Sequence, residues 1–174
     1  MNRIAIVCES MTGNTMMLSE ALRSHLQSRK IPVLKPSDAD PDAYDTYLVG
    51  SWTNKGDCGP QTAAFLAELQ TKDVFIFGTC GFGATEAYYE SIYHRVAAHL
   101  KPDNRILGHF ICQGKMPADV LVRFEALKQA NPDCTRWDGC IAHYNQALSH
   151  PDRQDLISLC ETAERCLQQT DSSI

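Results

Sequence analysis

The chain has 174 residues, of which 44% are hydrophobic and 21% are charged, as is typical of a globular protein with a substantial core. Its formal net charge of −5 and the absence of a basic cluster argue against nucleic-acid binding. No segment approaches the roughly 20 apolar residues of a membrane span, and Met1–Arg3 leads directly into an apolar run without signal-peptide features. We therefore expect a cytoplasmic protein with no nucleic-acid or membrane partner, folded as one domain over residues 1–174.

Apolar runs and turn residues divide the first part of the chain into short elements. Residues 3–8 are apolar and rich in Ile and Val, which is typical of a buried parallel strand. Pro32 lacks a backbone N–H, so the run around it suits an edge strand better than a central one. In chain order we expect a strand at 3–8, a helix at 17–26, an edge strand at 31–34, a strand at 44–52 and a helix at 61–69.

The second part of the chain continues this alternation. Residues 73–79 are the most strand-like run in the sequence. Residues 131–149 show no clear period, although Trp137 and Tyr144 indicate that this stretch is ordered against the body. In chain order we expect a strand at 73–79, a helix at 84–100, a strand at 105–112, a helix at 117–130 and a final helix from about 149 to 168.

Strands that alternate with helices predict an α/β fold, with a parallel sheet covered by helices on both faces. Five strands with the second at an edge fit a doubly wound sheet of order 2-1-3-4-5. Ligands of such sheets bind beyond the carboxyl ends of the strands, where the strand order reverses between strands one and three. The loops expected to meet there are 10–15, 51–59 and 79–83.

The first of these loops has the composition of an anion site. It joins a strand to a helix N-terminus, where unpaired backbone N–H groups and the helix dipole favour negative charge. Its side chains offer hydroxyls from Ser10, Thr12 and Thr15 and a carboxamide from Asn14, but no Lys or Arg. It also lacks the Gly-Lys-Ser/Thr of a nucleotide P-loop. The alternative interpretation is an N-capping turn of small polar residues.

Ser10-Met11-Thr12-Gly13-Asn14-Thr15 resembles the phosphate loop of flavodoxins and matches it at every position. The resemblance implies non-covalent binding of FMN and electron transfer between redox partner proteins, a reductase and an acceptor enzyme. It covers roughly residues 3–130 and leaves 131–174 as an expected C-terminal extension that ends in a helix.

Flavodoxins place the isoalloxazine ring between the loops that follow the third and fourth strands. The aromatic side chains available in those loops are Trp52 and Phe82, although Trp52 also suits a core aromatic at a strand end. Gly56-Asp57 resembles the flavodoxin turn whose peptide reorients when the flavin gains a proton. The residues expected to bind FMN are Ser10, Met11, Thr12, Gly13, Asn14, Thr15, Ser51, Trp52, Thr53, Gly56, Thr79, Cys80, Gly81, Phe82 and Gly83.

Two departures from the flavodoxin pattern affect the expected redox potential and partner. Few acidic residues lie near the loops expected to hold the flavin. Those present are Asp57 and Glu86, and the positive charge of Lys55 offsets them. The fourth-strand loop also lacks the aromatic-acidic sequence frequent in the family.

Two other functions remain open on the sequence alone. An FMN-dependent oxidoreductase would take hydride from NADH or NADPH and reduce a quinone, tetrapyrrole or other small acceptor, with His109, Cys112 or Lys115 lining its pocket. A non-redox module would use the same loop for phosphorylated ligands. The aromatic and glycine-bearing loops favour flavin, and the absence of a nicotinamide signature favours the electron carrier.

The eight cysteines form no Cys-x-x-Cys pair, which weakens thioredoxin-like and zinc-ribbon interpretations. Cys134, Cys140 and His143 fit no common zinc spacing. We expect mostly free thiols and no bound metal.

Overall fold

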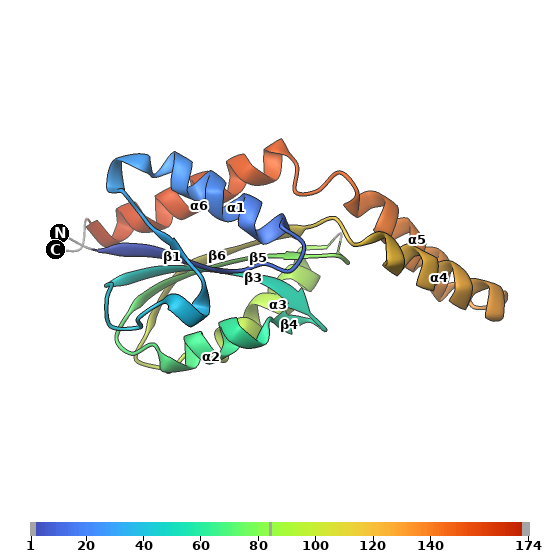
Figure 1. The fold of residues 1–174 in the computed structure, drawn as a ribbon, viewed down its shortest axis with the longest axis horizontal. Coiled ribbons are helices and arrows are strands. Elements are labelled where there is room, and N and C mark those ends of the chain that lie inside the picture. Colours follow the sequence, from blue (N-terminus) through green and yellow to red (C-terminus); the bar gives the residue numbers. More distant parts are fainter. Residues whose placement is uncertain (1–2, 84, 172–174) are drawn as a thin grey trace.

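A computed structural model describes residues 3–83 and 85–171. Its centre is a sheet in which five parallel strands follow the order β2-β1-β3-β5-β6, and β4 pairs antiparallel with β3 (Figure 1). The strands are β1 Ile4–Glu9, β2 Val33–Leu34, β3 Thr46–Asn54, β4 Asp57–Cys58, β5 Asp73–Cys80 and β6 Arg105–Gln113. The predicted fold class and strand order are confirmed.

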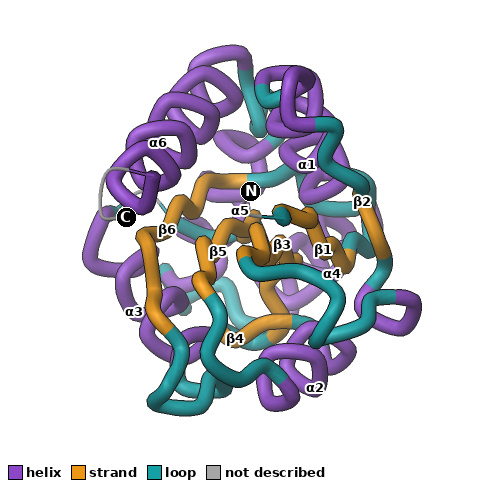
Figure 2. The backbone as a smooth tube through the Cα atoms, turned by 90° about the vertical axis from the view of Figure 1, so that its left-hand side faces the viewer, coloured by secondary structure: helices purple, strands orange, loops and turns teal. Residues whose placement is uncertain are grey.

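Helices cover both faces of this sheet, as Figure 2 shows from the end where the strands begin: α1 and α6 lie on one side and α2 and α3 on the other. The α-helices are α1 Asn14–His25, α2 Pro60–Glu68, α3 Glu86–Ala97, α4 Ala118–Ala130, α5 Arg136–Ala147 and α6 Arg153–Asp171, and short 3₁₀ turns span Gln27–Arg29 and Pro36–Asp38. The predicted helix at 84–100 begins later, at Glu86, and Ala84 lies outside the described residues.

Strand alternation divides the core into two layers, because neighbouring side chains of a strand point to opposite faces. In β1, Ile4 and Ile6 pack toward α1 and α6, whereas Ala5 and Val7 pack toward α2 and α3. The β5 strand repeats the pattern, and all its residues except Asp73 are buried. Burial on both faces explains why the strands read as continuous apolar runs in the sequence.

The segment after β6 was predicted only in part. Residues 131–149 contain a helix, α5, where the sequence analysis found no period, and α5 packs against α4 as a helical hairpin. Figure 1 shows this α4–α5 hairpin projecting away from the sheet, beyond the end where the parallel strands finish. A small third cluster around Phe124 and Tyr144 forms its core.

The chain returns to the body after the hairpin. The backbone N–H of Lys115 donates to the carbonyl of His150 at 2.8 Å, so the excursion of residues 116–149 is closed at its base. The last helix, α6, then packs against α1 and β6 and contributes Leu159, Ala163 and Leu167 to the core. The predicted extension 131–174 therefore contains two different parts, an outer helix and a helix of the core. That residues 1–174 form one domain stays a prediction.

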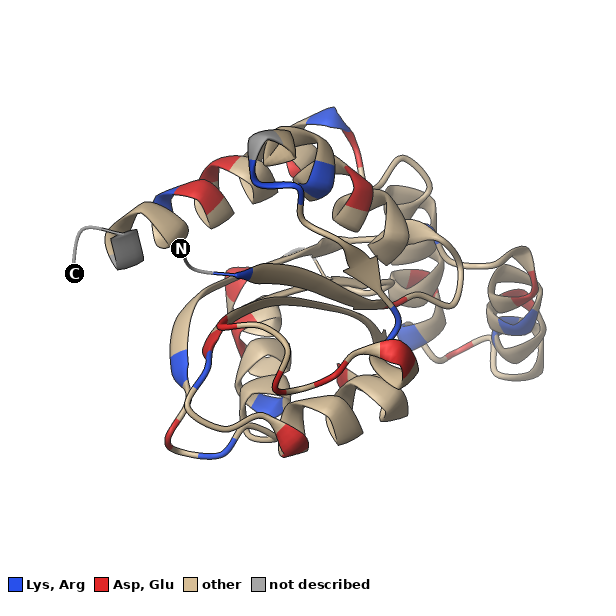
Figure 3. Cartoon of the chain, turned by 60° about the vertical axis from the view of Figure 1, so that its left-hand side comes forward, with Lys and Arg blue, Asp and Glu red and all other residues tan. Residues whose placement is uncertain are grey.

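The surface carries both signs of charge. Figure 3 shows Lys and Arg interspersed with Asp and Glu along the helices and loops that face the viewer. Among the described residues, none of the helices is both long enough and apolar enough to cross a membrane.

Candidate functional site

The three predicted loops lie at the carboxyl edge of the sheet, around the point where the strand order reverses between β1 and β3. Parallel pairing joins Glu9 to Ser51 and Trp52 to Thr79, so the ends of β1, β3 and β5 are neighbours. The sheet topology alone thus brings together the residues that the sequence analysis selected.

The Ser10–Thr15 loop leaves the N-terminus of α1 open. Gly13, the residue before the helix, has a φ of 91° and makes no side-chain capping bond, and the first turn has no acidic residue. A Cβ at Gly13 would meet nothing within 4 Å, and Met11, Thr12 and Gly13 are exposed. The Ser10 hydroxyl accepts the Gly13 N–H at 3.1 Å, which folds the loop toward the helix. An uncapped helix end surrounded by neutral donors suits a phosphate group.

A carboxylate stands directly before this loop, but it is directed elsewhere. The Oε2 atom of Glu9 accepts hydrogen bonds from the backbone N–H and the hydroxyl of Thr62, both at 2.8 Å, in the first turn of α2. Its Oε1 atom accepts the Trp52 indole N–H at 3.3 Å. The N-terminus of α2 therefore already holds an anion, whereas no side chain caps the N-terminus of α1. The hydrogen bond from the indole N–H to Glu9 also orients the half-buried Trp52.

Two side chains tie the phosphate loop to the rest of the site. The hydroxyls of Thr15 and Thr79 are 2.9 Å apart and buried, so Thr15 is a link between loops rather than an exposed donor. The carboxamide nitrogen of Asn14 donates to Thr12 Oγ1 at 3.0 Å and to the Lys115 carbonyl at 2.9 Å. These bonds fix the loop before any ligand is present.

The loop after β3 is a β-hairpin. Thr53 pairs with Cys58 and Asn54 with Asp57, and the two turn residues Lys55 and Gly56 both have positive φ, 51° and 86°. Two positive φ values are the signature of a type I′ turn, which matches the twist of paired strands. At the start of the loop, Ser51 Oγ accepts the Gly59 N–H at 2.8 Å.

Side chains of α3 hold this turn in place. Arg95 donates to the Gly56 carbonyl at 3.4 Å, and His99 pairs with Asp57 at 3.0 Å. Burial raises the pKa of Asp57, but the Cys58 N–H and His99 outweigh it and lower the pKa of this carboxyl overall. The Gly56-Asp57 peptide is therefore anchored to α3 in this structure.

The loop after β5 is shaped by packing and by a thiol. Cys80 Sγ donates to the Phe82 carbonyl at 2.8 Å, and burial raises the pKa of Cys80 to about 12, so the thiol is not a nucleophile at neutral pH. A Cβ at Gly81 would meet Met116 at 2.5 Å, and Gly83 has a φ of 128°. A larger residue at position 81 would collide with Met116, and a residue other than glycine at position 83 would be strained at this positive φ.

Phe82 lies where the sequence analysis placed it but has additional partners. Its half-buried ring packs against Phe124 of α4, with ring centroids 5.8 Å apart, and against His143 of α5, at 6.0 Å. Phe82 thereby connects the loop after β5 with the α4–α5 hairpin. Its contact with a flavin stays a prediction.

Several residues at this edge were not selected from the sequence. Gly114 approaches both Asn14 and Thr79, where an added Cβ would lie 2.8 and 3.1 Å from their side chains. Gln113 is 3% exposed, and among the described residues neither its Nε2 atom nor His143 Nδ1 has a hydrogen-bond partner. Gln113 directly follows the strand expected at 105–112, and this position was the signal that could have identified it as a site residue. Nothing in the sequence placed His143 near the loop after β5.

The residues proposed for a hydride-transfer pocket do not gather. His109 stacks on Tyr93 with centroids 3.8 Å apart and pairs with Glu90 at 2.8 Å. It lies four residues before the end of β6, about 13 Å from it at the usual strand rise. Cys112 is 4% exposed within the core, and Lys115 is exposed.

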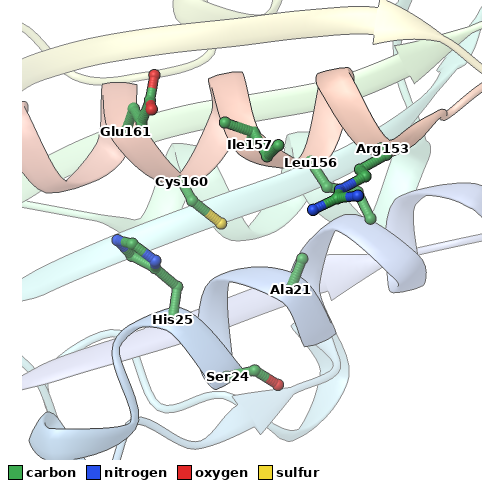
Figure 4. Close-up of a pocket in the computed structure, with 8 residues that line it drawn as sticks. All are labelled: Ala21, Ser24, His25, Arg153, Leu156, Ile157, Cys160 and Glu161. Atoms are coloured by element: carbon green, nitrogen blue, oxygen red, sulfur yellow. The ribbon is translucent and has the colours of Figure 1, made fainter.

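A hollow of about 480 Å³ lies far from these loops, between α1 and α6 (Figure 4). Its lining includes Ala21 and His25 from α1 and Arg153, Leu156, Cys160 and Glu161 from α6. The hollow is shallow and His25 is already paired with Glu164 at 2.8 Å. All eight cysteines are free thiols in this structure.

The chain is similar to known proteins along most of its length. A family model described as a flavodoxin domain matches residues 5–164. A flavodoxin-like domain-containing protein BilS of Clostridium symbiosum (strain WAL-14163) is 32% identical over 173 residues, covering 90% of this chain and 91% of that protein. A protein of the same description from Clostridioides difficile (strain CD3) is 28% identical over 155 residues, covering 87% and 88%.

Solved structures show the same fold at low identity. The crystal structure of oxidised flavodoxin 2 from Bacillus cereus matches with a TM-score of 0.55 at 16% identity, covering 96% of this chain and 99% of that chain. The apo form of an NADH:FMN oxidoreductase matches with a TM-score of 0.51 at 15% identity, covering 88% and 98%. With the family model spanning residues 5–164 and a relative 32% identical, the chain belongs to the flavodoxin domain family.

Proposed function

We propose that this protein binds one FMN at the carboxyl edge of its sheet and transfers electrons from a reductase to an acceptor redox enzyme. The supporting observation is the Ser10–Thr15 loop, which joins β1 to an α1 N-terminus that has no side-chain cap and no acidic first-turn residue. Bound FMN supplies a redox centre that accepts and donates electrons. Membership of the flavodoxin domain family supports the same assignment.

The residues at the carboxyl edge of the sheet have different roles in binding FMN. The backbone N–H groups at the start of α1, with the hydroxyls of Ser10 and Thr12, bind the phosphate. Thr15 and Asn14 hold the loop in position through Thr79 and Lys115. Trp52 and Phe82 supply apolar ring surface on two sides of the site.

Replacement of Thr12 by Val tests the phosphate assignment. Loss of a hydrogen bond to a charged acceptor costs about 1.5–3 kcal/mol, so FMN should bind roughly ten- to a hundredfold more weakly. Riboflavin, which lacks the phosphate, should bind both proteins equally. Titration of the apoprotein followed by flavin fluorescence measures both affinities. Ser37→Ala, which removes an exposed hydroxyl that donates to the neighbouring Asp38, is the control. Wild-type protein that binds FMN no better than riboflavin would contradict the proposal.

The electron carrier and the stand-alone oxidoreductase differ in their reaction with nicotinamides. A carrier relies on a separate reductase, so the isolated FMN-loaded protein should be reduced only slowly by NADH or NADPH. Addition of a flavodoxin reductase should accelerate that reduction strongly. Rapid bleaching of the flavin by NADH or NADPH alone would favour the oxidoreductase instead.

A further inference from the structure

Two buried side-chain nitrogens have no hydrogen-bond partner among the described residues, and both adjoin the loop after β5. Gln113, whose Nε2 is one of them, pairs with Cys80 in the sheet. His143, whose Nδ1 is the other, packs its ring on Phe82. Buried polar groups almost always have partners, because an unpaired one costs about 1–3 kcal/mol. Both nitrogens thus adjoin the loop after β5, one of the three loops at which the flavin is proposed to bind.

Gln113 stands next to the phosphate loop as well. The following residue, Gly114, donates its N–H to the Cys80 carbonyl at 2.9 Å and packs against Asn14 and Thr79. The carbonyl of Lys115 accepts a bond from the Asn14 carboxamide. The loop after β6 therefore connects the loop after β1 with the loop after β5, and Gln113 stands at its start.

The environment of Gln113 would otherwise favour an apolar side chain. Strand alternation places Gln113 on the same face of β6 as Ile111, and Ile111 and Cys80 belong to the apolar core on that face. With only 3% of its surface exposed, Gln113 has the burial of these neighbours. Methionine or leucine would fill comparable space without leaving an unpaired amide, so the amide has no packing role that explains it.

We propose that Gln113 is a cofactor-binding residue, whose carboxamide nitrogen donates a hydrogen bond to an acceptor oxygen of bound FMN. This assignment rests on the proposed function and extends it to a residue outside the three loops predicted from the sequence. A neutral amide recognises a carbonyl or hydroxyl oxygen, and FMN carries such oxygens in the parts that it shares with riboflavin. We assign the acceptor to these shared parts because strand alternation turns Gln113 to the face of β6 opposite to Gly114, the residue that packs against Asn14 and Thr79.

Replacement of Gln113 by Met separates a ligand contact from a structural role. Loss of a neutral hydrogen bond should weaken the binding of FMN and riboflavin by the same factor, about tenfold. Because the variant also removes an unpaired buried group, the melting temperature of the apoprotein should be unchanged or higher. Ile111→Val is the matched control on the same strand face, and it should lower the melting temperature while leaving both affinities unchanged.

If Gln113 instead holds a buried water, Gln113→Met should lower the apoprotein melting temperature and leave both affinities at the wild-type value, which would overturn the assignment. Nuclear magnetic resonance of the wild-type protein gives a second measurement that needs no folded variant. The side-chain amide signals of Gln113 should shift when FMN is added, and signals that stay in place would also overturn the assignment. Wild-type protein that binds neither flavin would refute the proposed function itself, whereas normal wild-type binding with an unaffected variant would refute only the role of Gln113.

Discussion

Thr15 and Thr79 form a buried hydroxyl pair on which the position of the phosphate loop depends. Replacement of Thr15 by Val removes one hydroxyl and leaves Thr79, itself 4% exposed, without its partner. We expect the free energy of unfolding of the apoprotein to fall by about 1–3 kcal/mol, measured by urea denaturation. Thr15→Ser keeps the hydroxyl and should lose much less. A Thr15→Val variant that is as stable as the wild type would show that the hydroxyl pair does not contribute to stability.

Trp52 gives a second test at the scale of single residues. The chain contains two tryptophans, and they lie in different regions, Trp52 at the end of β3 and Trp137 on α5. If Trp52 lies beside the bound flavin, FMN should quench its emission strongly. Trp137→Phe should keep most of this quenching and Trp52→Phe should abolish it. Quenching that survives in Trp52→Phe would place the flavin elsewhere.

At the scale of elements, the α4–α5 hairpin is joined to the body at a narrow base. The Lys115–His150 bond closes the excursion, and within the described part of the chain its apolar cluster reaches the body at Phe82. We therefore expect replacement of residues 118–147 by a short Gly/Ser linker to leave a folded body with one cooperative unfolding transition, seen by circular dichroism. Removal of α6, which supplies core residues, is the contrasting deletion and should prevent folding. A hairpin deletion that unfolds would contradict this modular arrangement.

The turn between β3 and β4 should make stability depend on acid pH. The pKa of Asp57 is lowered in the folded protein, so its carboxylate stabilises the fold above its ordinary pKa of about 4, and this contribution is lost as the pH falls through the lowered value. The Asp57→Asn variant has no carboxylate at this position, so its stability does not contain this pH-dependent contribution. The difference in unfolding free energy between wild type and variant should therefore shrink below about pH 4 and stay constant between pH 5 and 6. A difference that is independent of pH would mean that the contacts of the Asp57 carboxylate with the Cys58 N–H and His99 carry no charge-dependent stability.

At the scale of the whole molecule, local signals were enough to predict the sheet and the strand–turn–helix geometry around Ser10–Thr15. Strand, turn and helix signals adjoin one another around Ser10–Thr15, and burial on both faces marks the strands. The contacts that complete the site were not predictable in this way, because Asn14 meets Lys115 across 101 positions and Thr15 meets Thr79 across 64. The helix α5 was a different case. Its apolar residues do have helical spacing, but Gly139 and the turn residues before it obscured the pattern.

The place of α6 in the core has a consequence for how the protein folds during its synthesis on the ribosome. The face of the sheet that α1 covers stays partly exposed to solvent until Leu159, Ala163 and Leu167 have left the ribosomal exit tunnel, because these side chains complete that core layer. The strands and the α4–α5 hairpin are all translated earlier. The nascent chain thus presents a half-covered sheet for the whole time that the hairpin is being made, and chaperones that bind exposed apolar surface have their opportunity in this interval.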